Sequence, residues 1–381
     1  MIRKIKDYIL YKNSKYYSAF PSLILSPDNT ILLMFRRARD IRNLLNKEDE
    51  EYLHLKKMVD HIDSRSHLLK ISFDQQLQAI SEPEILSIDP EAADQDASLL
   101  LLSNGNILLS SFTWYPVHSR LYKALIANNV TLHGHPESTG CYYIFWGGLT
   151  RLSYDNGTSW SKHKYLPELP GAKDIIPGLR PSHGGVATGQ AIEIGNELFL
   201  PVYLHLDAYK TDTCHLYVSQ DGGENWQYRS IIAADQKQSI HFQEPSLIHC
   251  ENNNIMAFIR TRGAGDHLYT AVSNDLGKSW EEARQREEVI GHPTHPLKLK
   301  DGRIFICYGY RHKPYGIRGR LMDGNGNEFI GNEIIIRDDG DCADLGYPWA
   351  IQLPNDNILV AYYFTQADGV RHIAGTILDI S

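Results

Sequence analysis

Short apolar runs joined by polar turns recur along the whole chain. In the clearest cases an Asn-Gly or Asp-Gly pair, at positions 104–105 and 301–302, separates two runs of Leu and Ile. Runs of this length that are closed by such pairs predict β-hairpins. We expect six of them, at Ser22–Leu33, Leu99–Ser110, Ala191–Val202, Leu247–Ile259, Leu297–Cys307 and Ile351–Ala361.

An eight-residue motif, Ser-x-Asp-x-Gly-x-x-Trp, occurs three times, beginning at Ser153, Ser219 and Ser273. In such a turn the Asp accepts backbone N–H bonds and the Gly supplies a positive φ. Degenerate versions lie at Ser72–Asp74 and Arg320–Gly326. Together with the hairpins, this repetition predicts an all-β, six-bladed β-propeller, whose blades leave only short, protected edges. We expect each motif Trp to seal its hairpin against the next blade.

One segment departs from the β pattern. Arg42–Val59 is rich in Leu, Lys and Glu and lacks Gly and Pro, which favours a helix inserted in the first blade. Two roles are open for it: a solvated surface helix or a lid over a pocket. No linker is visible, so residues 1–381 are expected to form one propeller domain.

The charge balance is acidic, with a formal net charge of -8 over 381 residues. A nucleic-acid-binding protein would carry a basic patch, so we expect no nucleic-acid partner. An anionic substrate is still compatible, because a few arginines in a pocket outweigh a diffuse surface charge. The hydrophobic fraction of 42% is ordinary for a globular protein.

The five cysteines are scattered and include no Cys-x-x-Cys pair. This pattern favours buried free thiols over a disulfide framework or a zinc site. The first residues contain no apolar signal-peptide core, and no stretch is long and apolar enough to span a bilayer. A cytoplasmic location is the expectation, with secretion still open. The oligomeric state is not encoded in these patterns.

The three motifs resemble the Asp boxes of the sialidase (neuraminidase) superfamily, the BNR-repeat proteins related to glycoside hydrolase family 33. The resemblance runs over nearly the whole chain in blade order. Asp boxes are structural, so they indicate fold better than function. The resemblance implies an exo-glycosidase with a tyrosine nucleophile assisted by a glutamate, an aspartate acid/base, and three arginines that grip a substrate carboxylate.

Tyr347 and Glu244 resemble the nucleophile and its base. Tyr347 stands in Asp-Leu-Gly-Tyr-Pro-Trp before the last full hairpin, and Glu244 begins a hairpin whose outgoing strand ends at Arg260. A phenol has a pKa near ~10, so it needs a nearby base to attack at neutral pH. Arg260 is the matching carboxylate-binding arginine, with Arg262 a close competitor because alternate strand residues share a face.

The remaining arginines match the family less closely. Arg311 is our choice for the third arginine, with Arg318 also qualifying, because a planar guanidinium holds a carboxylate through two parallel bonds. The family's first arginine is replaced by Ala19. We expect Arg36 or Arg37, on the next strand, to supply the missing group. This departure makes Kdo or another ulosonic acid as plausible a substrate as sialic acid.

The acid/base is expected between that strand and the first degenerate motif. Asp63 is our choice, Asp60 is its neighbour and competitor, and Asp40 and Asp96 are further candidates. Such a residue must be protonated to act as an acid, so burial or nearby charge should tune its pKa. Four histidines are expected near the pocket: His61, His67, His183 and His295.

The sequence therefore predicts a retaining exo-glycosidase that removes a terminal carboxylated sugar of the ulosonic class from an acidic glycan. Tyr347 would attack the anomeric carbon, Glu244 would take its proton, and Asp63 would protonate the leaving oxygen. No metal or organic cofactor is expected. Two alternatives stay open: another carbohydrate-active propeller enzyme, such as a lyase or a uronic-sugar glycosidase, and a non-catalytic glycan-binding propeller.

Overall fold

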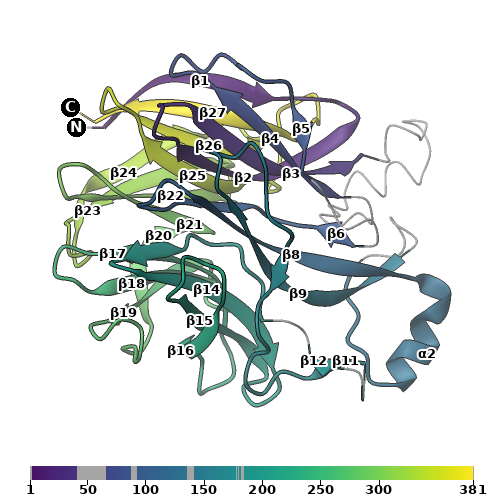
Figure 1. Cartoon of the computed structure of the whole chain (residues 1–381). Helices are drawn as coiled ribbons and strands as arrows, with labels where there is room; N and C mark the ends of the chain where they lie inside the picture. The colour runs from purple at the N-terminus through teal and green to yellow at the C-terminus, as the bar shows by residue number, and fades with distance from the viewer. Residues whose placement is uncertain are drawn as a thin grey trace.

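The computed structural model describes residues 2–40, 66–86, 92–134, 141–176, 178, 180–181 and 184–380. These residues form six antiparallel sheets arranged as the blades of a propeller (Figure 1). The six hairpins expected from the sequence form the first two strands of the six blades. The predicted Arg42–Val59 helix lies outside the described residues.

The strands follow the same order in each blade, from the axis outward. Blade 1 contains β2, β3, β4 and β5, at Tyr16–Leu25, Ile31–Arg39, His67–Phe73 and Glu84–Ile85. Blade 2 has its inner strand in two pieces, β6 and β7 at Ala93–Asp94 and Ser98–Leu101, which both pair with β8 (Ile107–His118). Its third and fourth strands are β9 and β10, at Cys141–Ser153 and Lys164–Tyr165. Blade 3 contains β13, β14, β15 and β16, at Ile192–Ile194, Glu197–Leu206, Thr211–Ser219 and Gln227–Ala233.

The second half of the ring repeats this order. Blade 4 contains β17, β18, β19 and β20, at His241–His249, Ile255–Arg262, His267–Ser273 and Arg284–Ile290. Blade 5 contains β21, β22, β23 and β24, at Thr294–Lys298, Ile304–Tyr310, Gly316–Met322 and Phe329–Arg337. Blade 6 contains β25, β26 and β27, at Gly346–Gln352, Ile358–Phe364 and His372–Asp379, and takes its outer strand β1 from Arg3–Tyr11.

Strand β1 closes the ring. It lies beside β27 (Figure 1) and pairs antiparallel with it, in a register that places Arg3 opposite Asp379. The first and last strands of the chain therefore belong to one sheet. Because every blade must pack against two neighbours, this shared sheet joins the two ends of the ring.

The core lies between neighbouring blades. Six clusters of buried side chains fill the six spaces, and each cluster draws residues from two adjacent blades. Inner strands are consequently buried on both faces, as in the ten-residue β2, where all but the two end residues are buried. This explains why the sequence shows apolar runs at these positions rather than strict alternation.

The Asp boxes form the turns between the third and fourth strands of blades 2, 3 and 4. In the first, Ser153 Oγ accepts the N–H of Gly157 at 2.8 Å and Asp155 Oδ1 accepts the N–H of Ser159 at 2.8 Å. Asp74 and Asp323 accept backbone N–H groups in the corresponding turns of blades 1 and 5. The degenerate motifs are therefore the same turn.

The direction expected for the motif tryptophans is wrong. Trp226 of blade 3 donates to Thr150 of blade 2 at 3.2 Å, and Trp280 of blade 4 donates to Ser230 of blade 3 at 3.1 Å. Each of these indole rings therefore seals the space between its own blade and the preceding blade. The physical reason is that the Asp-box turn follows the third strand and folds back over the space between its own blade and the preceding blade.

Helical structure is sparse in the described ranges. A 3₁₀ turn, η2 (Ser119–Leu121), leads into α2 (Tyr122–Ala127) between β8 and β9. The short strands β11 (Asp174–Ile176) and β12 (Arg180–Pro181) form a separate two-stranded sheet. None of the helices in the described ranges has the length and hydrophobicity needed to cross a membrane. All five cysteines are free thiols, and three of them are fully buried.

Candidate active site

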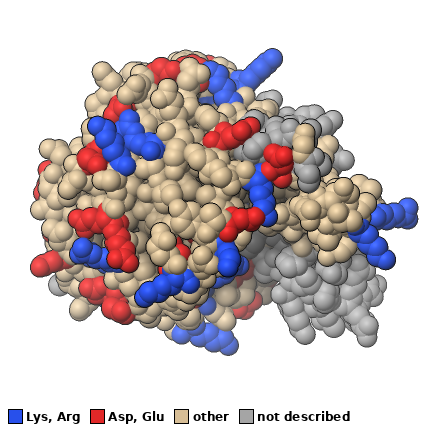
Figure 2. All heavy atoms as spheres, turned by 90° about the horizontal axis from the view of Figure 1, so that it is seen from below, with Lys and Arg blue, Asp and Glu red and all other residues tan. Residues whose placement is uncertain are grey.

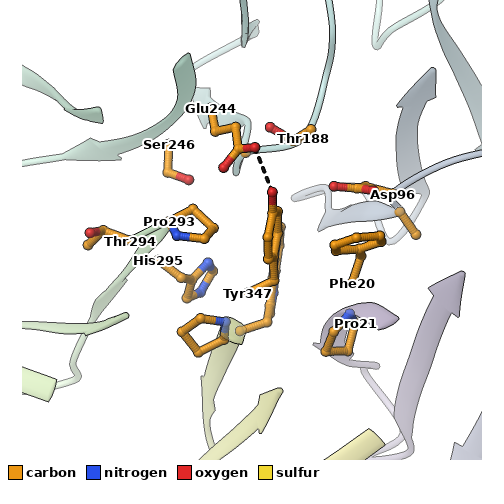
Figure 3. A pocket seen from close by; sticks show the side chains of 14 residues that line it. Phe20, Pro21, Asp96, Thr188, Glu244, Ser246, Pro293, Thr294, His295 and Tyr347 are labelled. Atoms are coloured by element: carbon orange, nitrogen blue, oxygen red, sulfur yellow. Dashed lines mark hydrogen bonds between the residues drawn. The ribbon is translucent and has the colours of Figure 1, made fainter. Parts of the chain in front are cut away.

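A narrow axial cavity of about 30 Å³ marks the centre of the ring (Figure 3). It takes side chains from all six blades, in each case from the inner strand or the segment beside it. Its lining is Phe20, Pro21, Asp96, Ala97, Thr188, Gly189, Glu244, Ser246, Pro293, Thr294, His295, Tyr347, Pro348 and Trp349. Residues that are far apart in the sequence thus meet at one place.

Three of these residues share an unusual backbone. Phe20, Glu244 and Tyr347 have φ values of 57°, 47° and 47°, and each is followed by a proline. The strand register shifts at the same points in β2, β17 and β25. A left-handed conformation is costly for residues with large side chains and concentrates at functional sites. Here it forms a bulge that turns the side chain toward the axis.

Tyr347, Glu244 and Arg260 form a hydrogen-bonded group at this bulge. The Tyr347 hydroxyl donates to Glu244 Oε1 at 2.6 Å, and Arg260 Nη1 donates to the same oxygen at 2.8 Å. Arg260 Nη1 also lies 3.1 Å from the Tyr347 hydroxyl. Figure 3 shows this hydroxyl pointing at Glu244. The phenol therefore has a carboxylate in position to take its proton and a guanidinium in position to stabilise the resulting charge.

Burial and nearby carboxylates act against nearby arginines on the pKa of Tyr347. Burial, and then the Glu244 and Asp96 carboxylates, raise its pKa well above the ordinary value, while Arg260 and Arg311 act in the opposite direction. The resting side chain is therefore a neutral phenol. Because Glu244 is only 6% exposed, the proton is held between two groups that water reaches poorly.

Arg311 covers the ring of Tyr347 from blade 5. Its guanidinium carbon lies 5.7 Å from the ring centroid. Nε donates to the Leu345 carbonyl at 3.1 Å, and Nη2 donates to the Tyr363 hydroxyl at 3.3 Å. These contacts place a second cation beside the phenol and hold it from the blade that carries Tyr347.

A third arginine, Arg36, reaches the same region from blade 1. In the β2–β3 register Arg36 lies directly opposite Ala19. Its side chain is fully buried, and its guanidinium lies 5.8 Å from the ring centroids of Tyr17 and Phe20. Phe20 in turn packs on Tyr347 with ring centroids 4.6 Å apart. Ala19 thus faces the guanidinium of Arg36 on the adjacent strand.

Arg36, Arg260 and Arg311 have equivalent places in their blades. Arg36 and Arg260 lie near the ends of the second strands β3 and β18, and Arg311 follows the end of β22. Their blades are 1, 4 and 5. Second strands end beside the bulges of the inner strands, so the three cations converge on the axial group.

Asp96 is the buried carboxyl group next to this cluster. It is 5% exposed and lines the axial cavity beside Phe20 (Figure 3). Burial, followed by the charge of Glu244, raises its pKa to about 8, against smaller lowering effects of Arg36 and Arg260. Asp96 is therefore protonated at neutral pH, in contrast to an ordinary aspartate with a pKa near ~4.

A much larger cavity, of about 520 Å³, lies between blades 2, 3 and 4. Gln243, the residue before Glu244, forms part of its wall, and Tyr203 forms another part. Burial and then the Glu244 carboxylate raise the pKa of Tyr203. Trp114 and Phe145 add aromatic surface, and the volume is large enough for a small ligand.

The profile of BNR repeat-like domains matches residues 113–360, which is more than half of the chain. The chain belongs to this BNR repeat-like family. Its fold is that of the sialidase-like members. No curated protein sequence matches this BNR-repeat propeller.

Solved structures share the architecture of the BNR-repeat propeller. A protein of unknown function from Dyadobacter fermentans is 32% identical, with a TM-score of 0.87 over 100% of this chain and 99% of that chain. The NanB sialidase from Streptococcus pneumoniae is 13% identical, with a TM-score of 0.67 over 98% of this chain and 70% of its own. The Hadza microbial sialidase Hz136 is 14% identical, with a TM-score of 0.66 over 97% and 68%. The two sialidases establish the fold.

Two arginines expected near the substrate point elsewhere in the BNR-repeat propeller. Arg37 lies over the ring of Tyr16 and donates to Tyr11 and His67, both at 3.0 Å. Strand alternation sends it away from the face used by Arg36. Arg318 is 3% exposed and donates to the carbonyls of Pro314, Ile317 and Arg337 within blade 5. It does not join the axial cluster.

Of the remaining candidates from the sequence, some lie outside the described residues and others lie within them. Asp60, Asp63, His61 and His183 lie outside the described residues. Arg262 lies against His241 and not against Glu244. Asp40 ends the first described segment, with its N–H bonded to the Lys15 carbonyl. His295 lines the axial cavity and packs on Trp349 in a tilted arrangement with ring centroids 4.3 Å apart, and burial lowers its pKa to about 3.

Sequence reasoning missed the support beneath the site. Asp344 accepts hydrogen bonds from Tyr17, Tyr363 and Arg371 at 3.0, 2.9 and 3.0 Å, and Tyr363 also accepts from Arg311. Through Tyr363, this buried network holds the guanidinium of Arg311 in place. The proline after each bulge residue was visible in the sequence and would have been a usable signal for the inward-turned positions.

On the face seen in Figure 2, the BNR-repeat propeller is of mixed charge. The face in Figure 2 shows Lys and Arg side chains interspersed with Asp and Glu among the described residues. This face offers no extended basic area of the kind that attracts a polyanion. The cationic groups of interest are the buried arginines of the axial cluster.

Proposed function

We propose that this chain is a retaining exo-glycosidase acting on terminal glycosides of a carboxylated, ulosonic-type sugar. The observation that carries the proposal is the 2.6 Å hydrogen bond from Tyr347 to Glu244, with Arg260 bonded to both. Membership of a family with sialidase-like fold supports a glycosidase or glycan-binding role. The axial chemistry favours catalysis, because a binding site has no need for a phenol paired with a buried base.

The first half of the reaction transfers the sugar to the enzyme. Glu244 takes the Tyr347 proton as the phenolic oxygen bonds to the anomeric carbon. The bond from that carbon to the leaving oxygen breaks, and an aspartic acid protonates the leaving group. In the second half, water gives a proton to the same aspartate, attacks the anomeric carbon and releases Tyr347, which recovers its proton from Glu244.

The choice of a phenol follows from charge. A carboxylated sugar would meet an anionic nucleophile with Coulomb repulsion, which is strong in a partly desolvated site. Tyr347 is neutral at rest, because burial raises its pKa. The developing phenolate gains stabilisation from Arg260 and Arg311 only as it forms, which is where stabilisation accelerates the reaction.

Arg36, Arg260 and Arg311 are proposed to hold the substrate carboxylate. They approach Tyr347 from three blades, and their guanidinium groups are suited to bidentate carboxylate binding. The absence of an arginine at position 19 shifts one of these donors to the neighbouring strand. This altered geometry supports Kdo or another ulosonic acid as strongly as sialic acid.

The proton donor is Asp63 or Asp96. Asp63 is favoured by the resemblance of the sequence, whereas Asp96 is the described carboxyl group that is protonated at neutral pH. Asn substitutions at the two positions, assayed on aryl glycosides with good and poor leaving groups, separate them. The true acid is the one whose loss harms the poor leaving group far more, because a good leaving group departs without protonation.

The deciding experiment is covalent trapping. Fluorinated glycosyl fluorides of sialic acid and Kdo should each be incubated with the protein, followed by intact-mass measurement and peptide mapping. A stable adduct on Tyr347, absent in Tyr347→Phe, is the expected result. Release of an unsaturated product would instead indicate lyase chemistry, and turnover without an adduct would reject Tyr347 as the nucleophile. Saturable glycan binding with no turnover of any 2-keto-3-deoxy glycoside would make the protein a lectin-like propeller and reject the proposal.

A further inference from the structure

A second group of polar side chains lies at the wall of the large cavity. His205 of β14 faces Asp212 of β15 directly across the blade 3 hairpin. His241, the first residue of β17 in blade 4, reaches the same carboxylate from the neighbouring blade. The axial chemistry uses none of these residues, and the group could not be predicted from sequence because its members come from two blades.

The spacing of these residues fits metal coordination. His205 Nδ1 lies 3.2 Å from Asp212 Oδ1, and His241 Nδ1 lies 3.1 Å from Asp212 Oδ2. The three potential ligand atoms all lie within 4.8 Å of one another. A tetrahedral ion with bonds of roughly 2.0–2.1 Å separates its ligands by about 3.3 Å. The two His–Asp distances already match this spacing, and a separation of up to 4.8 Å must close by up to about 1.5 Å.

The chemistry of the group also fits. We propose that His205, Asp212 and His241 bind a first-row divalent transition-metal ion at the wall of this cavity. Two imidazoles and one carboxylate are the ligands preferred by zinc and its neighbours, whereas calcium prefers oxygen ligands alone. Asp212 is 9% exposed, so its carboxylate already lacks most of its solvation.

Outer contacts orient the ligands. The Gln243 amide donates to Asp212 Oδ2, and the backbone N–H of Asp212 donates to His241 Nδ1 at 3.2 Å. The Gln243 contact is the kind of outer hydrogen bond that fixes the geometry of a metal ligand. The Asp212 N–H uses the lone pair of His241 Nδ1, so the ion must displace this hydrogen bond to coordinate that nitrogen.

Arg262 is the competing cation. It lies opposite His241 in the strand register, and its Nη2 is 3.1 and 3.2 Å from the two ring nitrogens. A guanidinium and a metal ion repel each other at this distance. Arg262 is exposed at the end of β18, so it can turn outward into solvent when the ion binds.

The site opens toward the cavity. His205 and Asp212 line the 520 Å³ space together with Gln243 and Tyr203. Three protein ligands leave at least one coordination position for an outside oxygen. The ligand class that fits is a carboxylate or a pair of neighbouring hydroxyls on a sugar. Metal binding itself needs no substrate, so this inference goes beyond the proposed glycosidase activity and fails or holds separately from it.

Isothermal titration of the full chain, stripped with a chelator and dialysed, tests the site directly. ZnCl₂, MnCl₂ and CaCl₂ are the probes. We expect one Zn²⁺ per chain, weaker Mn²⁺ binding as the usual affinity order requires, and no saturable Ca²⁺ binding. Absence of saturable Zn²⁺ binding would overturn the inference.

Variants locate the ion. Asp212→Asn and His205→Ala should each weaken Zn²⁺ binding at least about 100-fold, and Arg262→Gln should tighten it about threefold or more. His312→Ala is the matched control, since His312 is similarly exposed and pairs with Asp266 at 3.2 Å. Unchanged affinity in Asp212→Asn and His205→Ala, or weaker binding in Arg262→Gln, would reject this location. His205 is exposed, so its variant remains informative if Asp212→Asn unfolds.

Discussion

The hydroxyl of Tyr347 donates a 2.6 Å hydrogen bond to Glu244, although the two residues belong to blades 6 and 4. Both sit at bulges with φ of 47°, and both precede a proline. The pair therefore depends on two separate backbone irregularities that point at one axis. This arrangement has measurable consequences for activity, ionisation and stability.

Replacing Tyr347 with Phe should abolish turnover while preserving the fold. The ring still packs on Phe20, but the oxygen that we propose as the nucleophile is gone. We expect kcat/KM on an activated ulosonide to fall by about 10³-fold or more, as removal of a nucleophile does elsewhere. Thermal unfolding should show a small change in comparison. Activity retained at the wild-type level would exclude the phenol as nucleophile.

Asp96→Asn should change how stability depends on pH. In the folded protein the pKa of Asp96 is about 8, whereas in the unfolded chain it is near ~4. The folded state therefore binds the extra proton between these values, and the stability contributed by Asp96 falls as pH rises from about 4 to about 8. The Asp96→Asn variant carries an amide that does not ionise, so it should not lose stability in this way as pH rises.

Urea unfolding of wild type and Asp96→Asn at about pH 5 and about pH 8 measures the effect. The variant should gain stability relative to wild type as pH rises, by up to about 1.4 kcal/mol per pH unit. A difference that stays constant over this range would mean that Asp96 ionises normally. The same series on Asp94→Asn, a buried neighbour in blade 2, controls for the substitution.

Arg36→Lys should weaken binding of an acidic sugar, whereas Arg37→Lys should not. Arg36 is opposite Ala19 and packs on Phe20, while Arg37 is held by Tyr11 and His67. Loss of a charge-assisted, bidentate contact costs about 1.5–3 kcal/mol, so KM should rise roughly 10-fold or more with a smaller change in kcat. Equal effects of the two variants would contradict the assignment of Arg36 to the substrate.

Asp344→Asn should destabilise the propeller. Asp344 is 7% exposed and accepts from Arg371, Tyr17 and Tyr363. Removing its charge leaves Arg371 buried without its counter-ion, a change that costs about 3–5 kcal/mol. Asp356→Asn, in an exposed pair with Lys300, should cost at most about 1 kcal/mol. Chemical denaturation of the two variants provides the comparison, and similar losses would refute a special role for the buried network.

The ring and the meeting of Tyr347 with Glu244 could be anticipated from sequence, because repeated hairpins bring the starts of inner strands to one axis. The choice between Arg36 and Arg37 could not, since a one-residue shift of register reverses the face of each side chain. Arg318 points away from the axial cluster for a related reason: its guanidinium donates to the Arg337 carbonyl, which only the folded blade 5 brings near. The buried carboxylate of Asp344 depends likewise on partners from blades 1 and 6.

The bulge at Phe20 has a further consequence. It repeats the backbone geometry of the two positions that carry Glu244 and Tyr347, yet it presents an apolar ring. Blade 1 thus holds a position whose side chain points at the axial cluster and can be exchanged. A single substitution at residue 20 would place a new functional group at the axis without altering any strand. Natural or engineered variation at this one position could therefore change the chemistry of the axial cluster.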